Sequence, residues 1–177
     1  MKTLFKNLAI LAILVSPIIS CDELEDLVDV EKSVVLSENF TVDLKGGDDS
    51  FESQDLDISI LTSAIEPYAD LLKKVEIEKV TFQILNYSGD DAAEFEVKFS
   101  GDGTLFMDES FVASTAASNN TIFEVSDSTG LNTLASKLLN NDKVTIAFSA
   151  ESKNLENPAS FTVQAKFYIE VTANPLN

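Results

Sequence analysis

Residues 161–172, FTVQAKFYIEVT, alternate strictly between apolar and polar side chains, and this stretch decides the fold class. The apolar set consists of Phe161, Val163, Ala165, Phe167, Ile169 and Val171. Successive side chains of a β-strand point to opposite faces, so the pattern predicts a long strand with one buried face and one wet face. Strands of this kind are typical of antiparallel sheets that pack face to face.

Shorter segments show the same alternation. They are residues 40–44, 95–99, 121–125 and 144–150. The sequence GGDD at residues 46–49 predicts a turn after the first of them. SGDG at residues 100–103 predicts a hairpin between residues 95–99 and 104–107, because Asp and Gly tolerate the left-handed backbone of a tight turn.

The apolar pattern changes phase near the middle of the chain. Val75 and Ile77 occupy odd positions, whereas Val80, Phe82 and Ile84 occupy even ones. An extra residue around Glu78-Lys79, a β-bulge, would return both sets to one face of a single strand. The alternative is two separate strands that are joined there.

Two segments carry helical rather than strand periodicity. Residues 65–74 place Tyr68, Leu71 and Leu72 on one stripe, and residues 129–139 place five apolar side chains at helical spacing, with Asp127 or Ser128 as a cap. We expect each helix to cross between sheets and to cover an open end. The predicted fold is therefore mainly β: an antiparallel β-sandwich, of immunoglobulin-like or Greek-key type, with two short crossover helices.

The N-terminus has the layout of a secretory signal peptide. Lys2 and Lys6 precede an apolar run at residues 8–15, and Pro17 follows it. The apolar segment is shorter than the roughly 20 residues that span a bilayer. Residues 18–21, Ile-Ile-Ser-Cys, then resemble the lipobox of bacterial lipoproteins. This resemblance implies cleavage before Cys21 and acylation of Cys21; the alternative is a plain secretion signal that happens to precede a cysteine.

Three regions follow from this interpretation: a signal peptide at residues 1–20, an acidic tether at residues 21–32 and one β-sandwich domain at residues 33–177. The tether begins with the acidic run DELED at residues 22–26. In Bacteroidota, an acidic cluster directly after the acylated cysteine resembles the signal that exports lipoproteins to the outer face of the outer membrane. The alternative is a solvated spacer that anionic lipids repel.

The composition excludes several classes of chemistry. The chain has 30 Asp plus Glu, 12 Lys, neither Arg nor His, one Cys and a net charge of −18. Nucleic acid is a poor partner for so acidic a chain, and the usual general base and bidentate anion clamp are missing. Acidic pairs occur at residues 48–49, 90–91 and 108–109, where turn formation explains them better than catalysis. We assign no catalytic, cofactor-binding or metal-binding residue.

The lipobox, the acidic tether and the Phe-rich strands together are similar to small lipoproteins of flavobacteria and other Bacteroidota. The resemblance implies anchoring in the bilayer of the bacterial outer membrane through acylated Cys21, with the domain facing the cell exterior. The expected function is a non-enzymatic binding, adhesion or structural module whose protein or glycan partner the sequence does not identify. The alternative is a calcium- or glycan-binding module that uses its acidic loops.

Overall fold

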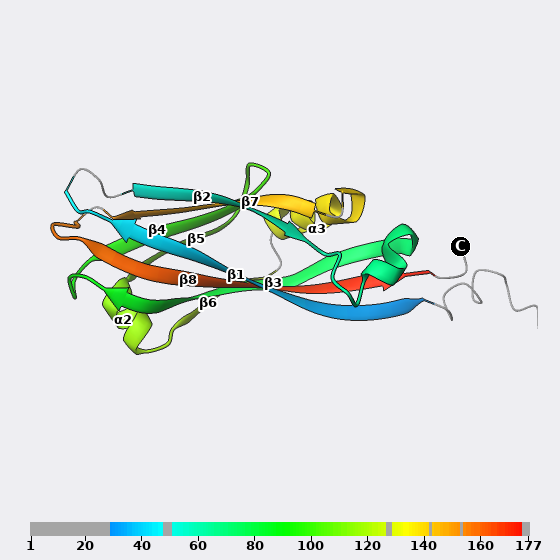
Figure 1. Cartoon of the computed structure of the whole chain (residues 1–177), viewed down its shortest axis with the longest axis horizontal. Helices are drawn as coiled ribbons and strands as arrows, with labels where there is room; N and C mark the ends of the chain where they lie inside the picture. The colour runs from blue at the N-terminus through cyan, green and yellow to red at the C-terminus, as the bar shows by residue number, and fades with distance from the viewer. Residues whose placement is uncertain (1–28, 48–50, 127–128, 142, 153, 175–177) are drawn as a thin grey trace, which may run out of the picture.

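The computed structural model describes residues 29–47, 51–126, 129–141, 143–152 and 154–174. Its strands are β1 (Val30–Leu44), β2 (Phe51–Ser59), β3 (Leu72–Ser88), β4 (Glu94–Gly101), β5 (Thr104–Val112), β6 (Ile122–Ser126), β7 (Lys143–Ser152) and β8 (Ala159–Ala173). Its helical segments are the 3-10 helix η1 (Glu66–Leu71) and the α-helices α2 (Ala113–Ser118) and α3 (Thr129–Asn141). Figure 1 shows the strands in two packed layers.

The predicted antiparallel β-sandwich is confirmed. The first sheet has the order β1-β8-β3-β6 and the second has the order β2-β7-β4-β5. Every connection passes from one sheet to the other except the β4–β5 hairpin. This strand order is that of a jelly roll, which is built from two Greek keys, and it differs from the order in an immunoglobulin domain. The connectivity therefore selects the Greek-key alternative.

The core lies between the sheets and is made largely of phenylalanine. All six apolar residues of the 161–172 stretch are buried, and β8 lies between β1 and β3 in the first sheet. Phe40 of the first sheet stacks on Phe148 of the second, with 4.8 Å between ring centroids. Phe95 and Phe161 make an edge contact at 4.9 Å. Such aromatic pairs add roughly 0.5–1.5 kcal/mol to the free energy gained by burial.

The phase change in β3 is a bulge within one strand, as predicted. Ile77 pairs with Ile169, and Lys79 pairs with Tyr168, so Glu78 is the extra residue. Val75 and Ile77 on one side of the bulge, and Val80 and Phe82 on the other, are all buried. The bulge keeps both apolar sets facing the second sheet.

The helix predicted at residues 129–139 is confirmed as α3, which buries Leu131, Leu134 and Leu138. The helix predicted at residues 65–74 is wrong in length and type: η1 covers Glu66–Leu71, and Leu72 already begins β3. Leu72 pairs with Ala173 of β8, so sheet pairing takes over the residues that would extend the helix. Both segments cross between sheets, and α2, a third crossover, was not predicted.

Two stretches of strand were not predicted from the sequence: the first residues of β1 and the whole of β2. β1 starts at Val30, so residues 30–32 belong to the sandwich rather than to the tether, because they pair with the end of β8. β2 was not predicted at all. It is an edge strand in which Ile58 is the buried side chain and Phe51 is 59% exposed, so its apolar alternation is weak.

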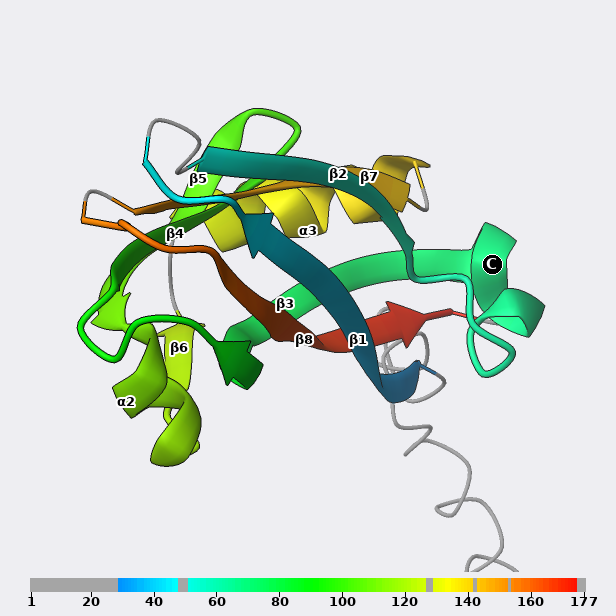
Figure 2. The ribbon, with the colours of Figure 1, turned by 60° about the vertical axis from the view of Figure 1, so that its left-hand side comes forward.

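The two described chain ends lie together at one end of the sandwich. Val30 pairs with Ala173, and the main-chain N–H of Asn174 donates a 2.9 Å hydrogen bond to the main-chain oxygen of Leu71 in η1. Figure 1 shows the start of β1 and the end of β8 at the same end of the sandwich. The opposite end, which we call the loop end, carries α2 and the β1–β2, β3–β4 and β7–β8 connections (Figures 1 and 2). Within the described ranges, no helix has the length and apolar character needed to cross a bilayer.

Candidate functional site

The acidic pairs named from the sequence do not form one site. Asp48-Asp49 and Cys21 lie outside the described residues. Asp90 and Asp91 lie in the β3–β4 connection at the loop end. The Asp90 carboxylate accepts two hydrogen bonds from Asn157 Nδ2, at 2.9 and 3.1 Å. The main-chain oxygen of Asp91 accepts a hydrogen bond from Ser114 Oγ at 2.6 Å. This pair therefore fastens neighbouring loops together.

Tyr87 lies beside the same acidic pair and closes the loop end of the core. Its hydroxyl donates a 2.6 Å hydrogen bond to the main-chain oxygen of Asp90. Partial burial, and then the negative charges of Asp90 and Asp91, raise the pKa of the Tyr87 phenol above its usual value. The fold therefore favours the neutral phenol, as expected of a group that packs and donates a hydrogen bond.

Asp108 and Glu109 are neighbours in β5 and point to opposite faces of the second sheet. Asp108 lies 3.9 Å from Lys98 on the outer face. Glu109 is half-buried on the other side. Their carboxylates therefore do not form a pair. Among the residues that the structure describes, no three Asp, Glu, Cys or His side chains gather as ligands for a metal ion.

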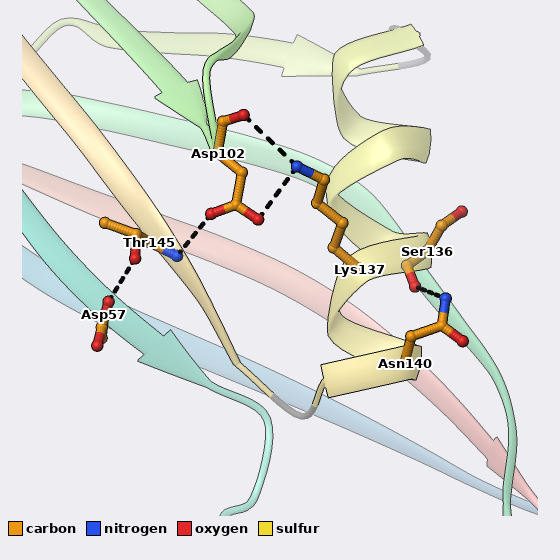
Figure 3. A network of polar contacts seen from close by, with 6 residues as sticks. All are labelled: Asp57, Asp102, Ser136, Lys137, Asn140 and Thr145. Atoms are coloured by element: carbon orange, nitrogen blue, oxygen red, sulfur yellow. Dashed lines mark hydrogen bonds and ion pairs between the residues drawn. The ribbon is translucent and has the colours of Figure 1, made fainter.

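A polar network joins four separate segments near α3 (Figure 3). Lys137 of α3 forms a 3.1 Å ion pair with Asp102, which occupies the β4–β5 turn. The other carboxylate oxygen of Asp102 accepts a 3.3 Å hydrogen bond from the main-chain N–H of Thr145, and the Thr145 hydroxyl donates to Asp57 at 2.6 Å. A hollow of about 460 Å³ lies over Asp57, Asp102 and Thr145. Since both carboxylates already have partners, we interpret this network as a structural clasp.

A second hollow, of about 140 Å³, lies on the outer face of the first sheet. We call it the outer-face hollow. It is lined by Lys79, Thr81, Phe82, Gln83, Ile122, Glu124, Gln164, Lys166 and Tyr168. These residues come from β3, β6 and β8, which lie side by side. The hollow is thus a shallow depression in the sheet surface.

Amide side chains line up across three strands at this hollow. Gln83 Nε2 donates to Gln164 Oε1 at 3.4 Å, and Gln164 Nε2 donates to Asn39 Oδ1 at 3.4 Å. Pairing places the three residues opposite one another on β3, β8 and β1. Amides both donate and accept hydrogen bonds, so the row can bind a ligand that carries hydroxyl groups.

Charged and aromatic groups border the amide row. Lys79 forms a 2.8 Å ion pair with Glu124 and lies 5.2 Å from the centre of the Tyr168 ring. The hydrogen bond to Glu124 is the main cause that raises the pKa of Lys79. Thr81 is 7% exposed, whereas Ile122 is 63% exposed. The hollow therefore combines hydrogen-bonding groups with an aromatic ring and an apolar rim, which suits a polar ligand of low charge.

The sequence alone identified part of this site. The alternation in residues 161–172 correctly placed Gln164, Lys166 and Tyr168 on a wet face. It did not show that β3 and β6 lie beside them, because strand order has no local signal in the sequence. The phase change in β3 is the one sequence signal that concerns the β3 side of the hollow. It predicted which residues of β3 point outward on either side of the bulge.

No family model and no curated protein sequence matches the chain. Several solved structures align with the chain at low identity. The crystal structure of the decameric BFDV capsid protein is 7% identical, with a TM-score of 0.49, and the match covers 80% of this chain and 99% of that one. The 60-mer form of BFDV capsid protein is 9% identical, with a TM-score of 0.46 and coverage of 85% and 97%. Desmodium yellow mottle tymovirus is 11% identical, with a TM-score of 0.32 and coverage of 82% and 91%. These likenesses concern the fold alone.

Proposed function

We propose that this protein is a non-enzymatic lipoprotein module, held on the exterior of a bacterial outer membrane by acylated Cys21. The observation that carries the proposal is the start of β1 at Val30, with only eight residues between it and the lipobox cysteine. Eight extended residues span at most about 26–29 Å. Acylation at Cys21 would therefore hold the sandwich close to the bilayer, and several acyl chains give the stable anchoring that one chain does not.

Lipid labelling tests the anchor. In the bacterial host, Cys21→Ser is expected to abolish incorporation of radioactive palmitate and to release the protein from the membrane fraction or leave it unprocessed. Ser20→Ala is the matched control, because it keeps a small residue at the cleavage position and should be labelled like the wild type. Labelling of Cys21→Ser at the wild-type level would contradict the proposal.

Protease shaving of whole cells tests the exterior location. Replacing Asp22, Glu23, Glu25 and Asp26 with Ala is expected to convert a protease-accessible protein into a protected one, with palmitate labelling intact. The control replaces the same number of acids on the second sheet: Asp55, Glu96, Asp108 and Glu151. If the tether variant is still shaved completely, the acidic run is only a spacer. If the wild type is protected, the exterior location is wrong.

A second candidate function is glycan binding, and the outer-face hollow is the observation that favours it. Tyr168, Gln164 and Gln83 supply a ring and amides in a row. We expect the affinity of the protein for members of a panel of bacterial and host polysaccharides to fall at least about tenfold in Tyr168→Ala. The substitution removes the ring on which a sugar can stack and also the contact that holds Lys79 in place. Thr172→Ala, four residues later on the same face of β8 and outside the lining of the hollow, is the control. Equal binding by both variants would remove this candidate.

Calcium binding by the acidic loops is the remaining alternative, and thermal unfolding distinguishes it. Screening of the large negative charge predicts that CaCl₂ and MgCl₂ raise the Tm equally at matched ionic strength. A rise with Ca²⁺ alone would favour a specific calcium site. Asp48 and Asp49 would then be the first residues to replace, because they are adjacent in the acidic sequence GGDD at residues 46–49.

A further inference from the structure

Among the residues that the structure describes, side chains cover only part of the outer edge of β1. β8 pairs with β1 from Val30 to Leu44 on one side. On the other side, the main-chain N–H of Asp43 donates to Glu52 Oε2 at 2.7 Å, and Gln54 Nε2 donates to the main-chain oxygen of Thr41. These bonds from β2 show that the odd-numbered residues of β1 direct their main-chain groups away from β8.

The same alternation continues toward the start of β1, because the pairing with β8 has no register shift. Outward-directed main-chain groups therefore follow at Glu31, Ser33, Val35, Ser37 and Asn39, and all five residues are exposed. An exposed edge of this length offers a row of donors and acceptors to another strand. Its centre is Val35.

We propose that this edge pairs with the same edge of a second copy of the chain, antiparallel, about a two-fold axis at Val35. In this register Ser33 lies opposite Ser37 of the second copy, and Val34 lies opposite Leu36. Lys32 lies opposite Glu38, and the symmetry makes this ion pair twice. The segment KSVVLSE at residues 32–38 is therefore complementary to its own reverse in charge and in side-chain type.

Other registers fit less well. Only registers that place odd residues opposite odd residues satisfy the hydrogen bonds of both edges. A two-fold axis at Val34 would place Lys32 opposite Leu36, and an axis at Leu36 would place Glu38 opposite Val34. The register centred on Val35 also covers this side chain, which is 53% exposed, and the half-buried Leu36.

The length of the exposed edge also favours a two-fold axis at Val35. Pairing from Glu31 to Asn39 of the second copy ends just before Thr41, where Gln54 of β2 begins to cover the edge. The two first sheets would join into one sheet of eight strands. A two-fold axis normal to that sheet places both outer-face hollows on the same side, so the dimer would present two copies of the hollow together.

Site-directed crosslinking of the full chain, whether or not it is membrane-bound, tests the register. Directly opposed residues of a hydrogen-bonded pair have Cα atoms about 5.5 Å apart, which suits a disulfide. Val35→Cys is therefore expected to give a covalent dimer under mild oxidation. Ser33→Cys alone is the matched control, because its symmetry mate is about 14 Å away along the strands. Co-expression of Ser33→Cys and Ser37→Cys chains should restore a dimer.

The wild type, whose one cysteine is Cys21, measures the background. Failure of Val35→Cys to exceed this background would overturn the proposal. Crosslinking of Ser33→Cys as efficient as that of Val35→Cys would overturn the register, since it would indicate unspecific collision. These outcomes do not depend on acylation, so the anchoring proposal and the dimer proposal can fail separately.

Charge reversal on the Val35→Cys background provides a second, independent measurement. Lys32→Glu and Glu38→Lys each place two like-charge pairs in the dimer and are expected to weaken association roughly tenfold. The double variant Lys32→Glu/Glu38→Lys restores opposite charges and should crosslink like the parent. A double variant as weak as the single ones would show that these side chains do not face each other.

Discussion

Two regions on the outer faces of the two sheets follow the same alternation of side chains but differ in local charge. On the second sheet, Lys98 is surrounded by Glu96, Asp108 and Glu151. Glu96 also lies directly opposite Glu151 in the pairing of β4 with β7. At the outer-face hollow of the first sheet, Glu124 stands with two lysines, Lys79 and Lys166. The region around Lys98, which we call the acidic face, thus has a clear excess of carboxylates, whereas the outer-face hollow is nearly balanced in charge.

This difference shows where a partner can approach. The acidic face repels anions, and water strongly hydrates its carboxylates, so this face favours solubility. At the outer-face hollow, Lys79 is neutralised by Glu124, and the amide row carries no charge. Desolvating amides and a tyrosine ring costs less free energy than desolvating isolated carboxylates. The outer-face hollow is therefore the better surface for recognition.

The largest expected effect is the difference in unfolding free energy between a substitution in the core and one on an outer face. Phe167→Ala removes a ring that is fully buried beneath the first sheet, and it should lower the free energy of unfolding by about 3–5 kcal/mol. Tyr168→Ala, one residue later on the outer face, should lower it by less than about 1 kcal/mol. Urea denaturation of the two variants measures both values. Equal losses of unfolding free energy in the two variants would mean that the outer face of the first sheet is also buried. The description of both outer faces as solvent-exposed would then be wrong.

A smaller effect is expected at the loop end, where carboxylates lie against a half-buried group rather than on an open face. The pKa of Tyr87 is raised above 10.0, mainly by burial and then by Asp90 and Asp91. The neutral phenol therefore stabilises the fold fully below pH 10, and this contribution is lost as the pH rises through the raised pKa.

Tyr87→Phe should cost about 0.5–1.5 kcal/mol at neutral pH, because the hydrogen bond to Asp90 is lost. It should also reduce the fall in stability between pH 10 and pH 12. Unfolding of wild type and variant across this pH range measures the difference. Parallel pH profiles would indicate that Tyr87 does not contribute to the alkaline loss.

The smallest expected effect tests the charge difference directly, because the same substitution should act with opposite sign on the two faces. Glu151→Lys replaces a like-charge pair with Glu96 by an opposite-charge pair, and should raise the Tm by about 1–2 °C at low salt. Glu124→Lys breaks the ion pair with Lys79 and should lower the Tm by a similar amount, about 1–2 °C. Both shifts should shrink in 1 M NaCl. Shifts of the same sign would show that the two faces do not differ as described.

The elements that were predicted correctly have strong local periodicity. β8, the bulge at Glu78, the Asp102-Gly103 turn and α3 each follow from side-chain spacing or turn chemistry within a few residues. Asp102 and Gly103 have φ values of 44° and 81°, as the turn requires. β2 and the first half of β1 were missed because they are edge strands with many exposed side chains. Their extended conformation depends on pairing with β7 and β8.

Gly130 shows how packing changes the meaning of a residue. Within a helix, glycine reads as a weak point relative to alanine. In the structure, however, a Cβ at this position would lie 2.6 Å from the Cβ of Phe106 and 2.7 Å from the main-chain oxygen of Leu105. The glycine is what lets α3 approach β5 so closely. Its role depends on a strand that lies far from it in the sequence.

The sequence by itself determined which side chains of β3, β4, β7 and β8 face inward, because alternation is a property of neighbouring residues in one strand. Only the tertiary structure decided which outward side chains become neighbours. Gln83 and Gln164 are 81 residues apart, and Asn39 and Gln164 are 125 apart, yet they form one amide row. Strand order sets these distances, and strand order depends on how the connections between sheets pack against a shared core. That packing involves the whole chain at once, so no single segment specifies it.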